Sequence, residues 1–491
     1  MMVRLFCCGF VLVASGASAA DSPTGWFEVK GAHVTVTSNL SLDAAKRAVV
    51  LAETTRSALL AAAWPGATLP QDRLRLVVFF SHQDFQFYFG DFVPHMDGVG
   101  GFPPTVFLYG LPDLWEKRST EELEVTTSVL KRVLMQHLEL FFYRRLPRWF
   151  WVGLSEFFET LRFSAEGKAA SFGGINVVAR SLYFSHRTLD VKDALAWGST
   201  FNPRDEATLL GLRGLSWLMV EWMYSTHLPE FVRFQTFLMS GMDPTKAWNL
   251  VLPKEVTANI DRELNFYARY GSLGGSAVPL PAGNFTSDGG RPLTSAEVHA
   301  VRAEAALAGE RPKEVAAEVS AALADDPGNV TALRLQLPLL KPAERLALAR
   351  RASVAHPNDD LAWLLLGDAL KDTGEAPEER RAAYKKATEL SPDHPLAFSA
   401  LAAMAIEAGK PQEAMTLALT AVQMAPWDPT LLDTLASALA AVGRCSESVS
   451  MEARAVDRAT ESGDASRSVY ATRLAEIHKT CNEAPTSKLT E

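Results

Sequence analysis

The stretch "LAWLLLGDALKDTGEAPEERRAAYKKATELSPDHP" (361–395) contains two helical segments followed by proline, and its pattern recurs along the second half of the chain. The prolines that end each helical pair are Pro327, Pro357, Pro392 and Pro426, at intervals of 30, 35 and 34 residues. A unit of this length buries its apolar face only by stacking on its neighbours. The sequence therefore predicts an array of stacked helix pairs.

The period and the residues inside each unit resemble the tetratricopeptide repeat (TPR). In the quoted unit the characteristic aromatic, Leu, small and closing Pro positions hold Trp363, Leu366, Gly367, Ala387 and Pro392. The corresponding positions of the next two units hold Phe398, Leu401, Ala402, Ala414, Ala421 and Pro426, and then Leu432, Leu435, Ala436 and Ala455. Small residues let paired helices approach closely, and the pairs then stack into a superhelix. We predict about four repeats over residues 294–460, the first being degenerate. A capping helix and tail are expected over 461–491.

The chain has 491 residues, which is too long for one compact core, so we expect more than one domain. Its net charge of −9 argues against a nucleic-acid partner, because phosphate binding needs a basic surface. Residues 1–20 have the layout of a secretory signal peptide: Arg4, an apolar run, and small residues before Asp21. We expect cleavage near residue 20, a periplasmic or secreted protein, and no transmembrane segment afterwards. The alternative is a short anchor that is not cleaved.

Two cysteines remain after removal of the signal peptide, Cys445 and Cys481. In an oxidising compartment they are able to form a disulfide, and the alternative is a pair of reduced thiols. We favour the disulfide, which requires a Cα separation below about 7 Å.

The part of the chain before the repeats alternates strand and helix patterns and then becomes mostly helical. Strands are expected at 26–38, 73–80 and 105–110, with a helix at 41–64 and further helices over 120–270. Residues 271–293 are rich in Gly, Pro, Ser and Asn, which is typical of a linker. We therefore predict an α+β domain over residues 21–270, a linker over 271–293, and the all-α array after it.

A second stretch, "LMQHLELFFYRRLPRWFWVGLSEFFETL" (134–161), predicts two buried helices over 120–145 and 148–163, divided at Pro147. The second helix is apolar nearly all round, so it must be buried. Gly153 lies in its middle, where a glycine costs about 1 kcal/mol relative to alanine. We expect another element to pack closely against that glycine.

This second helix resembles one from the gluzincin-type metallopeptidase domains of exported bacterial proteins, which often carry TPRs behind them. In that family a helix bears H-E-x-x-H, and the next opens with P-x-W-x-x-E-G-[LF]-[AS]-E-[YF]-[YF]. The matching residues are Pro147, Trp149, Gly153, Leu154, Ser155, Glu156, Phe157 and Phe158. The resemblance covers about residues 26–270 and implies a metallopeptidase-like α+β fold.

The zinc-binding residues of that family are missing. The family needs two His one helical turn apart, a Glu after the first His to activate water, and a Glu from the next helix. In the alignment register that we prefer, Met135 replaces the first His of the motif, Gln136 replaces the catalytic Glu, and Glu139 replaces the second His. Val152 stands at the position of the third ligand.

A second register takes His137 as the first ligand, but it places Leu138 and Phe141 at the other two positions. Neither register restores the motif, since a Gln amide is not a base and apolar side chains do not bind zinc. We predict no catalytic residue, no metal and no cofactor.

The polar residues that remain near the lost site have two interpretations. A residual site made of His137, Glu139 and Glu156 is one, because these side chains are all able to bind a metal. In the other, His137 is a hydrogen-bonded buried histidine, Glu139 pairs with His137, Arg132 or another neighbour, and Glu156 is structural. We favour the second.

Three functions are compatible with these patterns. The first is an exported pseudo-peptidase that binds protein or peptide partners through its repeats and its degenerate cleft. The second is a metal-dependent peptidase, or another hydrolase, with an altered ligand set. The third is an architectural part of an envelope assembly. We favour the first.

Overall fold

The computed structural model describes residues 25–67, 73–90, 95–97, 103–112, 129–144, 146–164, 167–186, 188–252, 259–280, 285–374, 376–462 and 464–483. The predicted signal peptide lies outside these residues. The contacts divide the chain into two compact units. The first comprises residues 1–49, 70–111 and 287–491, and the second comprises 50–69 and 112–286.

The first unit contains a six-stranded sheet in the order β4-β5-β3-β2-β1-β9. Its strands are β1 (Phe27–Lys30), β2 (Val34–Ser38), β3 (Leu74–Phe79), β4 (His95–Asp97), β5 (Thr105–Tyr109) and β9 (Arg291–Pro292). Strands β2, β3 and β5 are parallel to one another, whereas β1, β4 and β9 pair antiparallel. Parallel neighbours need a crossover, and helices α1 (Leu42–Ala63) and α2 (His82–Phe89) follow β2 and β3 in the chain. The predicted strands at 26–38, 73–80 and 105–110 are all present.

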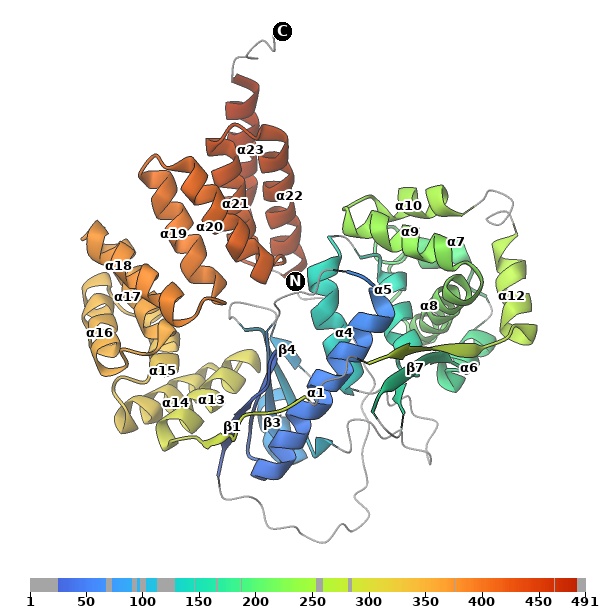
Figure 1. Ribbon diagram of the computed structural model, residues 1–491, viewed down its shortest axis with the longest axis horizontal. Helices are drawn as coiled ribbons and strands as arrows, with labels where there is room; N and C mark the ends of the chain where they lie inside the picture. The colour runs from blue at the N-terminus through green and yellow to red at the C-terminus, as the bar shows by residue number, and fades with distance from the viewer. Residues whose placement is uncertain are drawn as a thin grey trace. The chain divides into compact units, whose positions relative to one another are not determined.

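The helical array follows in the same unit as five helix pairs and one further helix (Figure 1). The pairs are α13 (Ser295–Ala308) with α14 (Pro312–Asp325), α15 (Val330–Gln336) with α16 (Pro342–Ala355), α17 (Asp360–Thr373) with α18 (Pro377–Leu390), α19 (Pro395–Glu407) with α20 (Pro411–Met424), and α21 (Pro429–Ala441) with α22 (Cys445–Ser462). A short 3₁₀ turn, Leu337–Leu339, follows α15, and α23 (Arg467–Glu483) comes last. The array thus has one pair more than the four repeats predicted, because the four closing prolines follow α14, α16, α18 and α20 and none follows α22.

The first helix of the array completes the core of the sheet. Trp26 and Phe79 meet edge to face with ring centroids 5.5 Å apart. Val301 and Ala305 of α13 belong to the same buried cluster. A capping box at Thr294 starts α13 directly after β9, which brings its apolar face onto the sheet.

The second unit is helical with a small antiparallel sheet, β6-β7-β8. Its further elements are α4 (Val129–Phe142), α5 (Arg148–Phe158), β6 (Arg162–Phe163), β7 (Ala169–Gly174), α6 (Val177–Ser185), α7 (Val191–Ala196), α8 (Glu206–Thr226), α9 (Leu228–Met239), α10 (Pro244–Val251), α12 (Ile260–Tyr270) and β8 (Gly274–Pro279). None of the helices described in either unit is long and apolar enough to cross a membrane.

The contacts group the chain differently from the predicted domain over 21–270 with its linker over 271–293. The six-stranded sheet groups with the array, because α13 supplies part of its apolar cover. The predicted linker contains β8, which pairs with β7, and β9, which pairs with β1. Gly and Pro in this segment suggested a flexible chain, but strand pairing satisfies its backbone instead.

Candidate functional site

Helices α4 and α5 carry the residues that the sequence analysis singled out, and they are neighbours in the second unit. Helix α4 begins at Val129 within the described residues, and the start of the predicted 120–145 segment lies outside them. Helix α5 starts after Pro147 as expected but ends at Phe158, before the predicted end at 163, because Arg162 and Phe163 pair with β7 instead.

The backbone of α5 touches that of α8 at Gly153. A Cβ atom on Gly153 would lie 2.4 Å from the carbonyl oxygen of Ser216 and 2.6 Å from Cγ2 of Val220. Such distances are shorter than any real Cβ contact, so only glycine fits. The close packing that the sequence predicted is present, and α8 supplies it.

Glu156 of α5 is buried and fully engaged. One carboxylate oxygen accepts a hydrogen bond from Nε of Arg213 at 2.5 Å and lies 3.9 Å from Nη2 of Arg132. The amide of Asn176 donates to the backbone oxygen of Glu156 at 2.9 Å and to its other carboxylate oxygen at 3.2 Å. Asn176 in turn caps α6 by accepting from the amide of Ala179. Glu156 therefore joins α4, α5, α6 and α8, which is a structural role.

Glu139 of α4 is buried without the partner that the sequence analysis expected. Its side chain is 3% exposed, and neither carboxylate oxygen has a hydrogen-bond partner among the described residues. Burial raises the pKa of Glu139 well above its ordinary value, which favours its neutral form. The expected pair with His137 or Arg132 does not form, since Arg132 approaches Glu156 instead.

A polar cluster lies one helical turn beyond Glu139. The Tyr143 hydroxyl accepts from Nε1 of Trp64 at 3.2 Å and from Nε2 of Gln235 at 2.7 Å. Gln235 also donates to the backbone oxygen of Ala63. Burial raises the pKa of Tyr143, and the neighbouring Glu139 adds to the effect. This cluster ties α4 to α1 and α9.

The other predicted positions are dispersed around α4 and α5. Met135 and His137 are buried, and the His137 ring meets Phe141 edge to face at 5.4 Å. Gln136 and Val152 are half-buried. Glu139 lies near Tyr143, whereas Glu156 pairs with Arg213. Throughout the described residues no three His, Cys, Asp or Glu side chains are grouped so as to hold a metal ion.

Sequence reasoning missed several buried acids in this unit, among them Glu221 of α8. Its carboxylate accepts from Ser225 at 3.0 Å and from the Tyr267 hydroxyl of α12 at 3.3 Å. Burial raises its pKa from the ordinary 4.5 to about 7. A lone acid within the apolar run "LSWLMVEWMY" (215–224) was the signal that would have found it.

The array presents the second candidate surface. The first helices of its five pairs begin at Ser295, Val330, Asp360, Pro395 and Pro429, so successive starts are 35, 30, 35 and 34 residues apart. First helices also meet one another, since the hydroxyls of Ser399 and Thr434 are 2.8 Å apart.

Close packing inside a pair depends on small residues at the TPR positions. A Cβ on Gly367 would lie 2.3 Å from the ring of Tyr384 on the partner helix, so this position requires glycine. The Tyr384 hydroxyl donates to Asp368 at 2.8 Å. The alanines at the equivalent positions are buried: Ala387, Ala402, Ala414, Ala421, Ala436 and Ala455.

Arginine–carboxylate pairs join consecutive repeats. Arg345 pairs with Asp372, and 35 residues later Arg380 pairs with Glu407. Two more pairs join second helices: Arg350 with Glu379 at 2.8 Å and Arg381 with Glu413 at 2.9 Å. The repeat period therefore extends to the charged residues.

The two cysteines form a disulfide at the end of the array. Cys445 opens α22, Cys481 lies near the end of α23, and their Cα atoms are 5.6 Å apart. This distance meets the limit of about 7 Å set for the pair.

No family model and no curated protein matches the sequence. Among solved structures, the chain is similar to TTC0263, a thermophilic TPR protein of Thermus thermophilus, at 19% identity and a TM-score of 0.31 over 37% of this chain and 99% of that one. It is also similar to the MamA protein, at 14% identity and a TM-score of 0.26 over 35% and 95% of the two chains. Yeast Tom70 is a third, at 12% identity and a TM-score of 0.31 over 75% and 67%. All three TM-scores are below 0.5, so the description as TPR-like repeats rests on the chain's own helix pairs.

Proposed function

We propose that this protein is an exported, non-catalytic binding protein whose TPR-like array takes protein or peptide partners. The observation that carries the proposal is the array itself: five helix pairs with small residues at the packing positions and first helices in mutual contact. Stacked helix pairs of this kind present an extended surface that suits a peptide or a helix.

The helical unit then acts as a pseudo-peptidase, a gluzincin-like scaffold that binds or positions without cutting. Support comes from the motif on α5 together with the side chains at the zinc positions, since Gln136 is no base and Val152 is no ligand. Glu156, the acid of the matching motif, is occupied by Arg213 and Arg132. A metal-dependent peptidase with an altered ligand set is the alternative.

Export to the periplasm or the exterior is part of the proposal. The layout of residues 1–20 supports it, and so does the Cys445–Cys481 disulfide, since such bonds persist in oxidising compartments.

The test is a matched pair of variants in the oxidised full-length protein. Ala403 is a half-buried residue of the first helix α19, and Ala382 is an exposed residue of the second helix α18. Tagged wild-type, Ala403→Arg and Ala382→Arg proteins are cross-linked in extracts of the source organism, and bound proteins are identified by mass spectrometry. We expect partners shared by wild type and Ala382→Arg to be lost from Ala403→Arg. The same partners on all three proteins would refute binding through the first helices.

A further inference from the structure

The last helix, α23, lies against a polar stripe on the last repeat. The stripe consists of Thr430, Asp433 and Ser437 of α21, which follow one another at helical spacing on one face. The hydroxyl oxygens of Tyr470 and Thr430 are 3.2 Å apart. Arg473 reaches the other two residues, with Nε 3.3 Å from an Asp433 carboxylate oxygen and Nη1 donating to Ser437 Oγ at 3.3 Å. Each residue of the stripe therefore meets a Tyr or Arg of α23, and these two are one turn apart.

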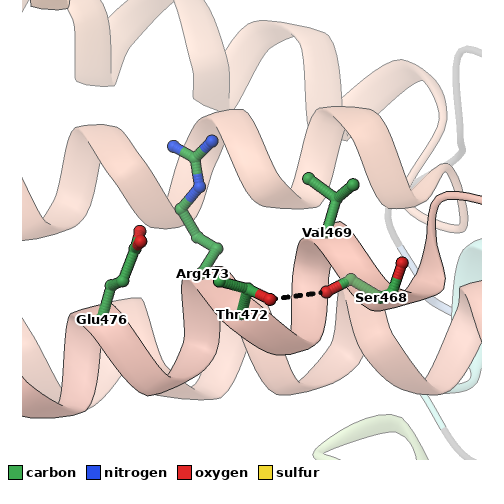
Figure 2. Close-up of a pocket in the computed structure, with 5 residues that line it drawn as sticks. All are labelled: Ser468, Val469, Thr472, Arg473 and Glu476. Carbon is green, nitrogen blue, oxygen red and sulfur yellow. Dashed lines mark hydrogen bonds between the residues drawn. The ribbon is translucent and has the colours of Figure 1, made fainter.

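Helix α23 buries few apolar side chains for its length, and it packs along α22, where Tyr470 joins a buried cluster with Ala455 and Ala459. Within its described side chains, Tyr470 and Ile477 are the buried apolar ones, each 6% exposed. The Arg473 side chain is 42% exposed, and an ion pair so open to water contributes little to stability. Figure 2 shows a hollow along α23, lined by Ser468, Val469, Thr472, Arg473 and Glu476. Arg473 therefore borders a hollow that is open to solvent on this side of α23.

A covalent bond adds to these contacts. The Cys445–Cys481 disulfide ties the end of α23 to the start of α22, across 36 residues of sequence. A cross-link of this kind removes the open, detached conformations from the ensemble. A helix with few buried apolar side chains is thus the one that the disulfide fastens.

We propose that α23 is the resident occupant of a helix-binding site, and that reduction of the Cys445–Cys481 disulfide opens this site to a partner helix that presents a Tyr and an Arg one turn apart. The proposal rests on the proposed function of the array and names the class of partner for its last repeat. The partner is cationic at the Arg position because Asp433 faces that position.

The opening step needs a dithiol reductant. The dithiol supplies two electrons and two protons, the S–S bond breaks, Cys445 and Cys481 become two thiols, and the reductant closes into its own disulfide. Once untied, α23 competes with other helices at a high effective concentration, so a partner binds only as α23 detaches.

The experiment uses the full-length chain and, as probe, a fluorescent synthetic peptide of residues 467–483 with Cys481→Ser. The Arg473→Glu chain has a weakened resident helix and an unchanged stripe. We expect this chain, reduced with dithiothreitol, to bind the peptide at least about tenfold more tightly than the oxidised form does. We expect no binding of a peptide that itself carries Arg473→Glu. We also expect no binding of the original peptide to a chain that carries both Arg473→Glu and Asp433→Asn. Arg467→Glu, a charge reversal at an exposed residue of α23, is the matched control and leaves the peptide excluded.

Hydrogen exchange over residues 467–483 reports separately whether α23 has detached. Equal peptide binding to oxidised and reduced chains would overturn the proposal. So would detachment of α23 without any peptide binding. If circular dichroism shows that Arg473→Glu does not fold, Tyr470→Phe weakens the same helix more gently. These outcomes are distinct from failure of the proposed function, because the Ala403 test uses the oxidised protein and a different repeat.

Discussion

Two acids in the helical unit differ in how burial is compensated. Glu156 is buried together with two arginines and an asparagine, and it serves to join helices. Glu139 is buried with neither a hydrogen bond nor an ion pair to any described residue, and burial raises its pKa well above the ordinary value. A carboxyl group in that state contributes little to stability, because its polar atoms lose water and gain nothing.

Replacing Glu139 with methionine should therefore stabilise the protein. The change keeps the side-chain volume and removes two unpaired polar atoms, so we expect a gain of about 1–3 kcal/mol in the free energy of unfolding at pH 7. Urea unfolding of wild type and Glu139→Met measures it. The control is Glu156→Met, which strands two arginines and should destabilise; a loss of stability in Glu139→Met would contradict our account of this residue.

Glu221 predicts a pH dependence with a defined sign. Its folded-state pKa is raised from 4.5 to about 7, so the folded state binds the proton more tightly than the unfolded state. The stability that Glu221 contributes to the folded state is thus fully present below pH 4.5 and is lost as the pH rises to about 7. The loss in the free energy of unfolding is up to roughly 3 kcal/mol.

Unfolding of Glu221→Gln at several pH values between 5 and 8 tests this sign. We expect a flatter dependence of the free energy of unfolding on pH than in wild type. The matched control is Glu230→Gln, a change in the first turn of α9, which should leave the slope as it is. An unchanged slope in Glu221→Gln would show that another group is responsible.

At the scale of elements, the helices depend on a few close approaches more than on their overall apolarity. The sequence predicted that another element packs closely at Gly153. That element is α8, whose Ser216 backbone oxygen and Val220 side chain lie against the Gly153 backbone of α5. The sequence was unable to name α8, because a glycine indicates a close approach without indicating its partner. It likewise predicted the TPR units from small residues such as Gly367, where Tyr384 fills the space.

A methyl group at Gly153 should force α5 away from α8. We expect Gly153→Ala to lower the free energy of unfolding by about 3 kcal/mol, since the clash at 2.4 Å is with a backbone oxygen that does not move freely. Thermal unfolding measures this loss. Gly174→Ala in the same unit, where a Cβ meets nothing within 4 Å, should change stability much less. Similar losses in both variants would contradict a specific α5–α8 contact.

At the scale of the whole molecule, the sequence identified the repeats and most of the elements but not their grouping. The strands, the helix pairs and the disulfide partners were readable because each is set by local pattern or by elimination among few cysteines. The attachment of α13 to the sheet was not, because Val301 and Ala305 look like ordinary repeat residues. The environment of Glu139 was not predictable either, because nothing in the sequence indicates with which acid an arginine such as Arg132 forms an ion pair.

A half-buried triad of charged residues joins the sheet to the array within the first unit. The carboxylate of Glu304 in α13 forms ion pairs with Arg75 of β3 at 2.6 Å and with Arg334 of α15 at 2.8 Å. Burial acts to raise the pKa of Glu304, but the two arginines outweigh it and hold the pKa below its ordinary value. A depressed pKa stabilises the folded state above the unfolded pKa, and this stability is lost as the pH falls through the folded value.

Glu304→Gln should therefore cost about 1–3 kcal/mol at pH 7, because two half-buried arginines lose their counter-charge, and it should remove part of the acid sensitivity of the first unit. Urea unfolding at pH 7 and at pH 3 tests both expectations. Arg350→Gln breaks a half-exposed pair on the array and serves as the control, with an effect near 0–1 kcal/mol. A small effect for Glu304→Gln would mean that the triad is not what joins sheet and array.

Zinc content distinguishes the pseudo-peptidase from an altered metallopeptidase. We expect elemental analysis of the purified, dialysed protein to find less than about 0.1 zinc per chain, because neither Gln136 nor Val152 binds metal. His137→Ala should give the same value. Stoichiometric zinc that disappears in His137→Ala would instead favour the altered metallopeptidase.

The division of the first unit into three stretches of sequence has a consequence for synthesis on the ribosome. Strand β1 is made early, yet β9 and the Asp288 that bonds Lys30 emerge about 258 residues later. At 5–20 residues per second, that is a wait of roughly 10–50 s. The second unit, whose residues all precede 287, is complete before then. We expect the nascent chain to fold from its middle outward, with β1 and β2 open to chaperones until the first repeat helix arrives.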